Sequence, residues 1–183
     1  LRGEGELERW ARERLGWEPA RLMELRDELL PEFVDELARS RDWGAYDLVG
    51  FTSTFQQQVA SLALARRLRA RWPELTIVIG GANVDGAMGA AHLRAFPWVD
   101  YTVTGEGERS LCRLVEALRA GTSPEDIPGV VGRESARSGR PPTPSERPEM
   151  DDLGVPRYEE FFDRAHRLGL DAREGWLTAI PFE

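Results

Sequence analysis

Three short apolar runs alternate with three helical patterns in the middle of this 183-residue chain. The apolar runs cover residues 46–52, 75–79 and 99–103, and turn residues bound each of them. Between and after these runs, apolar residues recur every three or four positions, which is the period of an amphipathic helix. Short strands that alternate with helices fold into right-handed βαβ units around a parallel sheet. The alternation therefore predicts an α/β fold with three parallel strands.

The residues that flank this core have a different character. Residues 1–44 are rich in Glu and Arg around a leucine stripe, which predicts a helical segment. Residues 45–133 make up the predicted α/β domain, of Rossmann-like or flavodoxin-like type, and the run PGVVG at 128–132 fits one more short strand. Residues 134–183 begin with a stretch rich in Ser, Arg, Pro and Glu without periodicity, which predicts an exposed connector.

The helices that follow the second and third strands carry two further predictions. Asp85 is expected to cap the first of them, which carries Met88, because a carboxylate can accept the free backbone N–H groups of a first turn. In the second, Leu111 and Leu114 fall at core spacing on either side of Cys112. We expect the cysteine, the only one in the chain, to serve in packing.

A loop of unusual composition leaves the carboxyl end of each predicted strand. Ligands of open parallel sheets bind outside these ends. Each loop also has a purely structural interpretation, as a helix cap, a tight turn and a helix start respectively. Because all three fall at one edge of the sheet, we predict a ligand site there. In chain order the loops are Thr52-Ser53-Thr54, Gly80-Gly81-Ala82-Asn83 and Gly105-Glu106-Gly107-Glu108.

Composition excludes several classes of function. The formal net charge of −8 argues against a surface that binds nucleic acid through its phosphates. All 24 basic residues are Arg, so neither a Schiff-base lysine nor the lysine of a phosphate-binding loop is present. One cysteine cannot form an internal disulfide or a cysteine-built metal site. The sequence shows no membrane span and no secretory signal, and we expect a cytoplasmic protein.

An ordered set of motifs gives this sequence a family resemblance. The motifs are Asp47-Leu-Val-Gly-Phe-Thr-Ser-Thr-Phe-Gln-Gln, Ala60-Ser-Leu-Ala-Leu-Ala-Arg, Ile79-Gly-Gly-Ala-Asn, Met88-Gly, Phe96-Pro-Trp-Val-Asp-Tyr and Gly105-Glu-Gly-Glu. Together they resemble cobalamin-binding radical SAM proteins, and in particular the C-methyltransferases that mature ribosomally made peptides. The resemblance covers residues 43–133, and the last residues, Pro181-Phe-Glu, resemble the lead-in to that family's radical SAM barrel.

The resemblance implies a role for each loop. Ser53 and Thr54 would contact the nucleotide tail of cobalamin, with Phe55 in the Leu position of the family's Ser-x-Leu element. Thr52, just before them, is also expected to bind the cofactor. Gly80, Gly81 and Ala82 would wall the channel for that tail, and Asn83 with the Gly105-Glu106-Gly107-Glu108 loop would touch the corrin periphery or the nucleotide. In the family's full-length enzymes, a radical SAM barrel of the same polypeptide adds S-adenosylmethionine and a [4Fe-4S] cluster, and the methyl group passes to a carbon of a precursor peptide.

The chain also departs from the family. It lacks the three closely spaced cysteines of the cluster, and no pair of strands precedes its helical segment. We therefore expect an internal fragment, inactive alone, whose site holds the cofactor but has no catalytic residue. No Asp-x-His-x-x-Gly motif is present, and neither His92 nor His166 is expected to bind cobalt. The cobalamin is expected to be base-off without a protein histidine.

Two other interpretations compete with this one. The domain could be a flavodoxin-like module for a different cofactor or for a protein partner. Alternatively, Glu106 and Glu108 could serve a hydrolase or transferase, but acids two positions apart at the start of a helix point in different directions. A dinucleotide fingerprint fails at Ser110, which stands where its third glycine is needed.

Overall fold

The computed structural model describes residues 4–169, which divide into two compact units at residue 147. The first unit, residues 1–147, holds the sheet and most of the helices. The second unit begins at residue 148 and contains η5 (Met150–Asp152) and α8 (Glu159–Arg167). Within the described residues, no helix has the length and apolar character needed to cross a bilayer. The Pro181-Phe-Glu motif lies outside the described residues.

A four-stranded sheet forms the centre of the first unit, with its strands in the spatial order β1-β2-β3-β4. Its strands are β1 (Leu48–Thr52), β2 (Thr76–Gly80), β3 (Tyr101–Val103) and β4 (Val130–Gly132). The first three are parallel, as the alternating pattern predicts, and PGVVG supplies the fourth strand. β4 runs antiparallel to β3. The predicted α/β class is confirmed.

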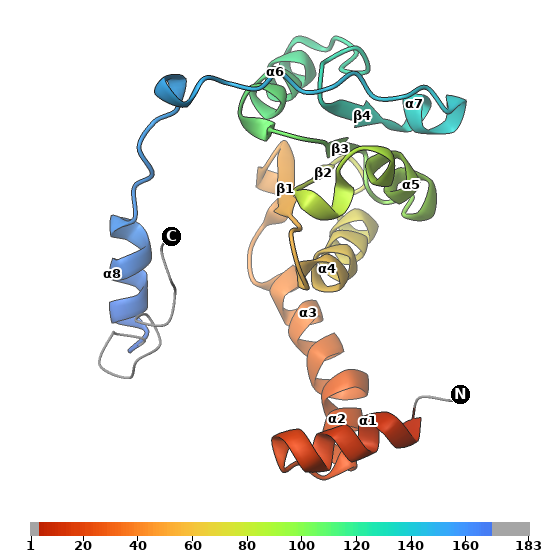
Figure 1. The fold of residues 1–183 in the computed structure, drawn as a ribbon, viewed down its shortest axis with the longest axis vertical. Coiled ribbons are helices and arrows are strands. Elements are labelled where there is room, and N and C mark those ends of the chain that lie inside the picture. Colours follow the sequence, from red (N-terminus) through yellow and green to blue (C-terminus); the bar gives the residue numbers. More distant parts are fainter. Residues whose placement is uncertain (1–3, 170–183) are drawn as a thin grey trace. The chain divides into compact units, whose positions relative to one another are not determined.

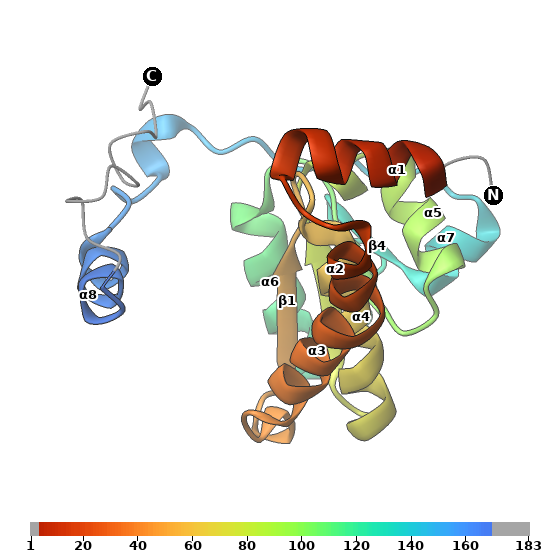
Figure 2. The same ribbon diagram turned by 90° about the horizontal axis from the view of Figure 1, so that it is seen from below.

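Helices cover the two faces of the sheet unequally. One face packs Ile77 and Ile79 of β2 against α4 (Gln57–Arg71) and α5 (Ala87–Ala95), together with α3 (Leu30–Arg39) and α7 (Arg133–Ser138). The opposite face packs Val78 and Val103 against Leu114 of α6 (Gly107–Ala120). Figures 1 and 2 show α6 on the other side of the sheet from α4. The side chains of β2 alternate between the two cores, as strand geometry requires.

The predicted N-terminal helical segment is present. It consists of α1 (Glu4–Trp10), η1 (Ala11–Leu15), α2 (Pro19–Glu24), η2 (Leu25–Leu29) and α3, followed by η3 (Trp43–Ala45) before the first strand. Of the leucines in its stripe, Leu29 and Leu30 are exposed. The helices of this segment pack on their neighbours in the chain, and α3 packs on α4. Among the described residues of this segment, those that join the core of the sheet lie in α3 and just after it.

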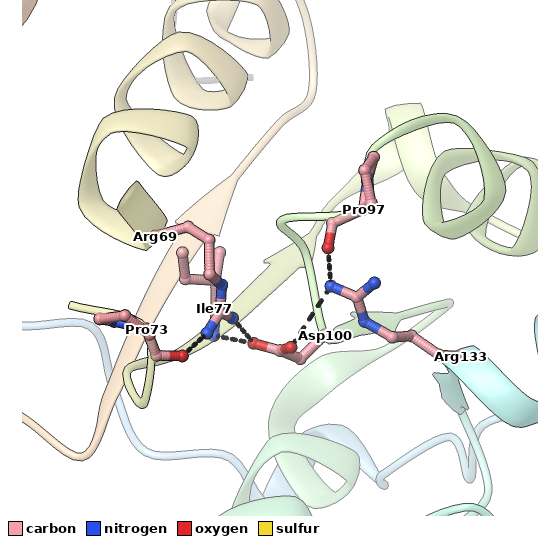
Figure 3. Close-up of polar contacts among 6 residues, drawn as sticks. All are labelled: Arg69, Pro73, Ile77, Pro97, Asp100 and Arg133. Atoms are coloured by element: carbon pink, nitrogen blue, oxygen red, sulfur yellow. Dashed lines mark hydrogen bonds and ion pairs between the residues drawn. The ribbon is translucent and has the colours of Figure 1, made fainter. Parts of the chain in front are cut away.

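Charged side chains close the amino edge of the sheet around Asp100 (Figure 3). One carboxylate oxygen of Asp100 accepts hydrogen bonds from the backbone N–H of Ile77, at 2.8 Å, and from the guanidinium of Arg69. Its other oxygen lies 3.5 Å from Nη2 of Arg133. The two arginines also donate to the carbonyls of Pro73 and Pro97. Asp100 thus connects the starts of β2 and β3 with α4 and with the residue that follows β4.

Two expectations for loops and ends are wrong. The stretch after residue 133 is not exposed throughout, because α7 buries Ser135 and Ala136, and the Glu125 carboxylate accepts hydrogen bonds from the N–H groups of Glu134 and Ser135. Asp85 is not the cap of α5, whose N-cap is Gly86. The Asp85 carboxylate instead bonds the N–H of Gly105 in another loop. Neither the contacts of Glu125 nor the contact of Asp85 with Gly105 leaves a periodic signal in the sequence.

Replacement of Asp100 by Asn tests the amino-edge cluster. The amide keeps the volume but loses the charge that two arginines face, and we expect the free energy of unfolding to fall by about 2 kcal/mol in urea denaturation. Asp126→Asn is the matched control, since the Asp126 side chain is 80% exposed beside Arg140. Its expected cost is below about 0.5 kcal/mol. Equal losses for the two variants would contradict the structural role given to Asp100.

Candidate functional site

The three predicted loops begin side by side at the carboxyl edge of the sheet. Thr52, the last residue of β1, pairs with Gly80, the last residue of β2, and Gly80 pairs with Val103, the last residue of β3. This register makes the three strands end level with one another, so all three loops leave the same edge of the sheet. The prediction that the three loops lie at one edge of the sheet is therefore confirmed.

The first and second loops are joined through Ser53. Its side chain is fully buried, and its backbone N–H donates to the Gly80 carbonyl at 2.8 Å. The backbone N–H of Asn83 donates to the Ser53 carbonyl at 3.0 Å. The Asn83 amide group then donates to the Ser53 hydroxyl at 3.0 Å and to the Phe55 carbonyl at 2.8 Å. Asn83 is thus bonded to two residues of the neighbouring loop, Ser53 and Phe55.

Gly81 allows the second loop to approach the first so closely. Its φ of +98° lies in a region that side chains rarely adopt, and a Cβ added there would lie 2.7 Å from the Ser53 carbonyl oxygen. The contact is with backbone, which cannot move aside as a flexible side chain would. The second glycine of the Gly80-Gly81 pair is therefore required by the packing of the loops.

The third loop is held from two sides. The Gly105 N–H donates to Asp85 Oδ1 at 2.9 Å, and the Glu106 N–H donates to Ser145 Oγ at 3.1 Å. The Glu106 carboxylate accepts from Ser145 at 3.2 Å and lies 3.4 Å from Nε of Arg147. Its own backbone N–H, and then Ser145 and Arg147, lower the pKa of the Glu106 carboxyl.

A cleft of about 470 Å³ opens between these loops, β1, β2 and α6. Five of its lining residues are glycines, the others are apolar except for one threonine, and none carries a charge. The lining residues are Gly50, Phe51, Thr52, Val78, Gly80, Gly81, Val103, Gly105, Gly107 and Leu111. A ligand in this cleft would therefore meet backbone groups and apolar side chains.

The predicted site residues divide into two groups. Thr52 and the glycines at 80, 81, 105 and 107 line the cleft. The Ser53 hydroxyl is buried on Asn83, the Glu106 carboxylate pairs with Ser145 and Arg147, and Thr54, Phe55 and Ala82 are exposed outside the cleft lining. The second group supports the loops or flanks the cleft, so its contact with a ligand stays a prediction.

Sequence reasoning missed the part of the site that lies on the sheet face. Gly50 interrupts the apolar run of β1 and shares the face of Leu48 and Thr52, because alternate residues of a strand point the same way. That alternation could have marked Gly50 as a gap in the face. Leu111, expected in the core, is 42% exposed and lines the cleft. Asp85 and Ser145 give no local signal.

His92 and Cys112 are not among the residues that line the cleft. Both ring nitrogens of His92 have partners, since Nε2 contacts the Gln58 amide and Nδ1 lies 3.0 Å from the Met88 carbonyl. The expectation that Cys112 packs in the core is wrong, because this residue is exposed on α6. Among residues 4–169, no group of three or more His, Cys, Asp or Glu side chains could hold a metal ion.

The chain is similar in sequence to a known methyltransferase. No family model matches the chain. It is 28% identical over 114 residues to an uncharacterised methyltransferase of Pyrococcus horikoshii, a match that covers 62% of this chain and 24% of the relative. The chain thus spans about a quarter of the length of that protein.

Two solved structures of one enzyme are also similar. Both are of the radical S-adenosylmethionine methyltransferase TsrM from Kitasatospora setae. The complex with tryptophan substrate and a SAM analogue shares 25% identity at a TM-score of 0.43, over 58% of this chain and 20% of that one. The complex with cobalamin and a [4Fe-4S] cluster shares 21% identity at a TM-score of 0.45. That match covers 72% of this chain and 24% of the other. Both TM-scores are below 0.5, so the fold assignment rests on the sheet described above.

A comparison of two glycine variants tests the contact between the first two loops. Gly81→Ala combines an unfavourable φ with a clash against the Ser53 backbone, and we expect it to lower the free energy of unfolding by roughly 3 kcal/mol. Gly121→Ala is the control, because Gly121 also has a positive φ, of +66°, but nothing within 4 Å of an added Cβ. Its expected cost is about 1 kcal/mol. Similar costs in urea denaturation would show that the close approach is unimportant.

Proposed function

We propose that this chain binds cobalamin and is the cofactor-holding part of a methyltransferase. The observation that carries the proposal is the uncharged, glycine-lined cleft at the carboxyl edge of the sheet. Ligands of open α/β sheets bind at this edge. The same loops carry the motifs that resemble cobalamin-binding radical SAM proteins. The relationship to a methyltransferase of Pyrococcus horikoshii supports the reaction class.

The residues of the cleft fit part of such a ligand. Gly50 and Gly80 have no side chains, and a Cβ added to Gly50 would meet only Leu48, at 3.9 Å, so the floor is open to a flat group. Val78, Val103 and Leu111 supply apolar contact. Thr52 offers a hydroxyl at the mouth. A volume of about 470 Å³ suits the nucleotide tail but not a whole cobalamin. A second hollow, of about 590 Å³, lies over Leu48 and Thr76 further along the strands.

The residues of this chain would bind the cobalamin and orient it. Bound cobalamin would supply the chemistry of carrying a methyl group. The glycine backbone would hold the ligand close to the sheet, and Leu111 would exclude water from one wall. Both ring nitrogens of His92 already have partners within the protein. We therefore propose that no histidine of the first unit binds the cobalt.

The finer parts of the proposal follow from the family resemblance. We propose a cytoplasmic enzyme in which a radical SAM barrel of the same polypeptide brings S-adenosylmethionine and a [4Fe-4S] cluster. Its substrate would be a carbon centre of a ribosomally made precursor peptide. The sequence relative is about four times as long as the matched region, which is consistent with chemistry that depends on further domains.

Titration with hydroxocobalamin tests cofactor binding. Wild-type protein should shift the visible absorbance bands of the added cobalamin. Gly50→Leu would place a side chain on the cleft floor, where an added Cβ meets only Leu48, at 3.9 Å. We expect its Kd to rise about tenfold or more, since lost contacts worth about 1.4 kcal/mol suffice. Val49→Ile is the matched control, because the neighbouring residue of β1 packs in the core on the opposite face.

Three outcomes separate the possibilities. A shift that Gly50→Leu weakens and Val49→Ile leaves unchanged supports binding in the cleft. A shift that both variants leave unchanged would move the cobalamin site elsewhere. No shift with wild-type protein would contradict the proposed function.

A further inference from the structure

Residues 143–147 lie against the third loop of the site, and we call this stretch the latch segment. Its backbone is attached first at Thr143, whose carbonyl accepts a hydrogen bond of 2.8 Å from the Gly129 N–H. A Cβ added to Gly129 would lie 2.9 Å from Ser145 Cβ, so the segment passes close to the turn before β4. The sequence predicts an exposed connector here, but side chains of this segment bond the third loop and α6.

Ser145 makes the central contact of the latch segment. Its hydroxyl accepts from the Glu106 N–H at 3.1 Å and donates to the Glu106 carboxylate at 3.2 Å. A Cβ on Gly105 would lie 2.2 Å from the same oxygen, so the serine rests directly on the backbone of the loop. One side chain therefore engages both the backbone and the carboxylate of the residue that precedes α6.

Charged residues directly after Ser145 also hold the latch segment in place. The two Glu146 oxygens lie 2.6 and 3.0 Å from the two Nη atoms of Arg113, and Arg109 lies 3.5 Å away. Arg147 reaches Glu106. The Arg113 hydrogen bonds lower the pKa of the Glu146 carboxyl, and the pKa of the Glu106 carboxyl is lowered as well. Each exposed pair contributes little alone, but together they join two adjacent residues of the latch segment to the third loop and to α6.

The same loop forms a wall of the cleft. Gly105 and Gly107 line the cleft, and Glu106 between them is bonded to Ser145. On the other side the Gly105 N–H is bonded to Asp85. With both backbone donors engaged by side chains from distant parts of the chain, the position of this wall depends on Asp85 and on the latch segment together.

We propose that Ser145 is a positioning residue that fixes the third loop as a wall of the cleft, and that ligand binding and closure of the latch segment are coupled. This inference rests on the proposed cobalamin site. Coupling is reciprocal, so a ligand that needs the wall in place also holds the latch segment closed. The latch segment is the last part of the first unit, which ends at Arg147.

Hydrogen exchange and cobalamin titration of Ser145→Ala test the proposal. Loss of a hydrogen bond worth about 1 kcal/mol predicts that the Glu106 amide of the ligand-free protein exchanges about fivefold faster. The Kd for hydroxocobalamin should rise by a similar factor. Hydroxocobalamin should slow exchange in residues 143–147 of the wild type and slow it less in Ser145→Ala. The control is Ser138→Ala, which removes a hydroxyl that donates to the Ser135 carbonyl within α7.

The outcomes distinguish this inference from the proposed function. Unchanged exchange at Glu106 in Ser145→Ala would overturn the positioning role, whether or not cobalamin binds. Faster exchange with an unchanged Kd would overturn the coupling. If wild-type protein binds no cobalamin, the proposed function fails and the coupling fails with it. Exchange at Glu106 would then show only whether Ser145 holds the loop.

Discussion

The carboxyl edge of this sheet depends on the backbone of Ser53, on which the second loop rests. Asn83 donates to Ser53 and Phe55 from its backbone and its side chain, and this approach is possible only because Gly81 has no Cβ. The consequence is functional as well as structural. Polar side chains of Ser53 and Asn83 join the loops, and apart from Thr52 the cleft is lined by glycines and apolar residues.

The two edges of the sheet are built on opposite principles. At the amino edge, the Asp100 carboxylate faces two arginines and bonds the start of β2, so charge connects the strands. In the cleft at the carboxyl edge no lining residue is charged, and Glu106, between two lining glycines, pairs with Ser145 and Arg147. Charge near the cleft therefore holds its wall in place without entering it, which suits a bulky ligand with an uncharged portion better than a free phosphate.

Local patterns predicted the elements and the edge of the site, and long-range contacts decided the rest. The alternation of apolar runs with helical periods located β1, β2 and β3, since buried strands and amphipathic helices differ in period. The antiparallel direction of β4 and the role of Asp85 could not be predicted, because each depends on a partner about 20 or more residues away. Within the site, the hydrogen bond from Asn83 to the Ser53 hydroxyl joins residues 30 positions apart and leaves no local signal either.

The most direct test of the account is to observe the cleft glycines themselves when cobalamin is added. Glycine-selective ¹⁵N labelling and NMR would follow the backbone amides of wild-type protein during titration with hydroxocobalamin. We predict that the amides of Gly50, Gly80, Gly81, Gly105 and Gly107 shift, while those of Gly121 and Gly139, which lie outside the cleft lining, stay in place. Unchanged amides at the cleft glycines, or shifts confined to glycines outside it, would contradict a cobalamin site at this edge of the sheet.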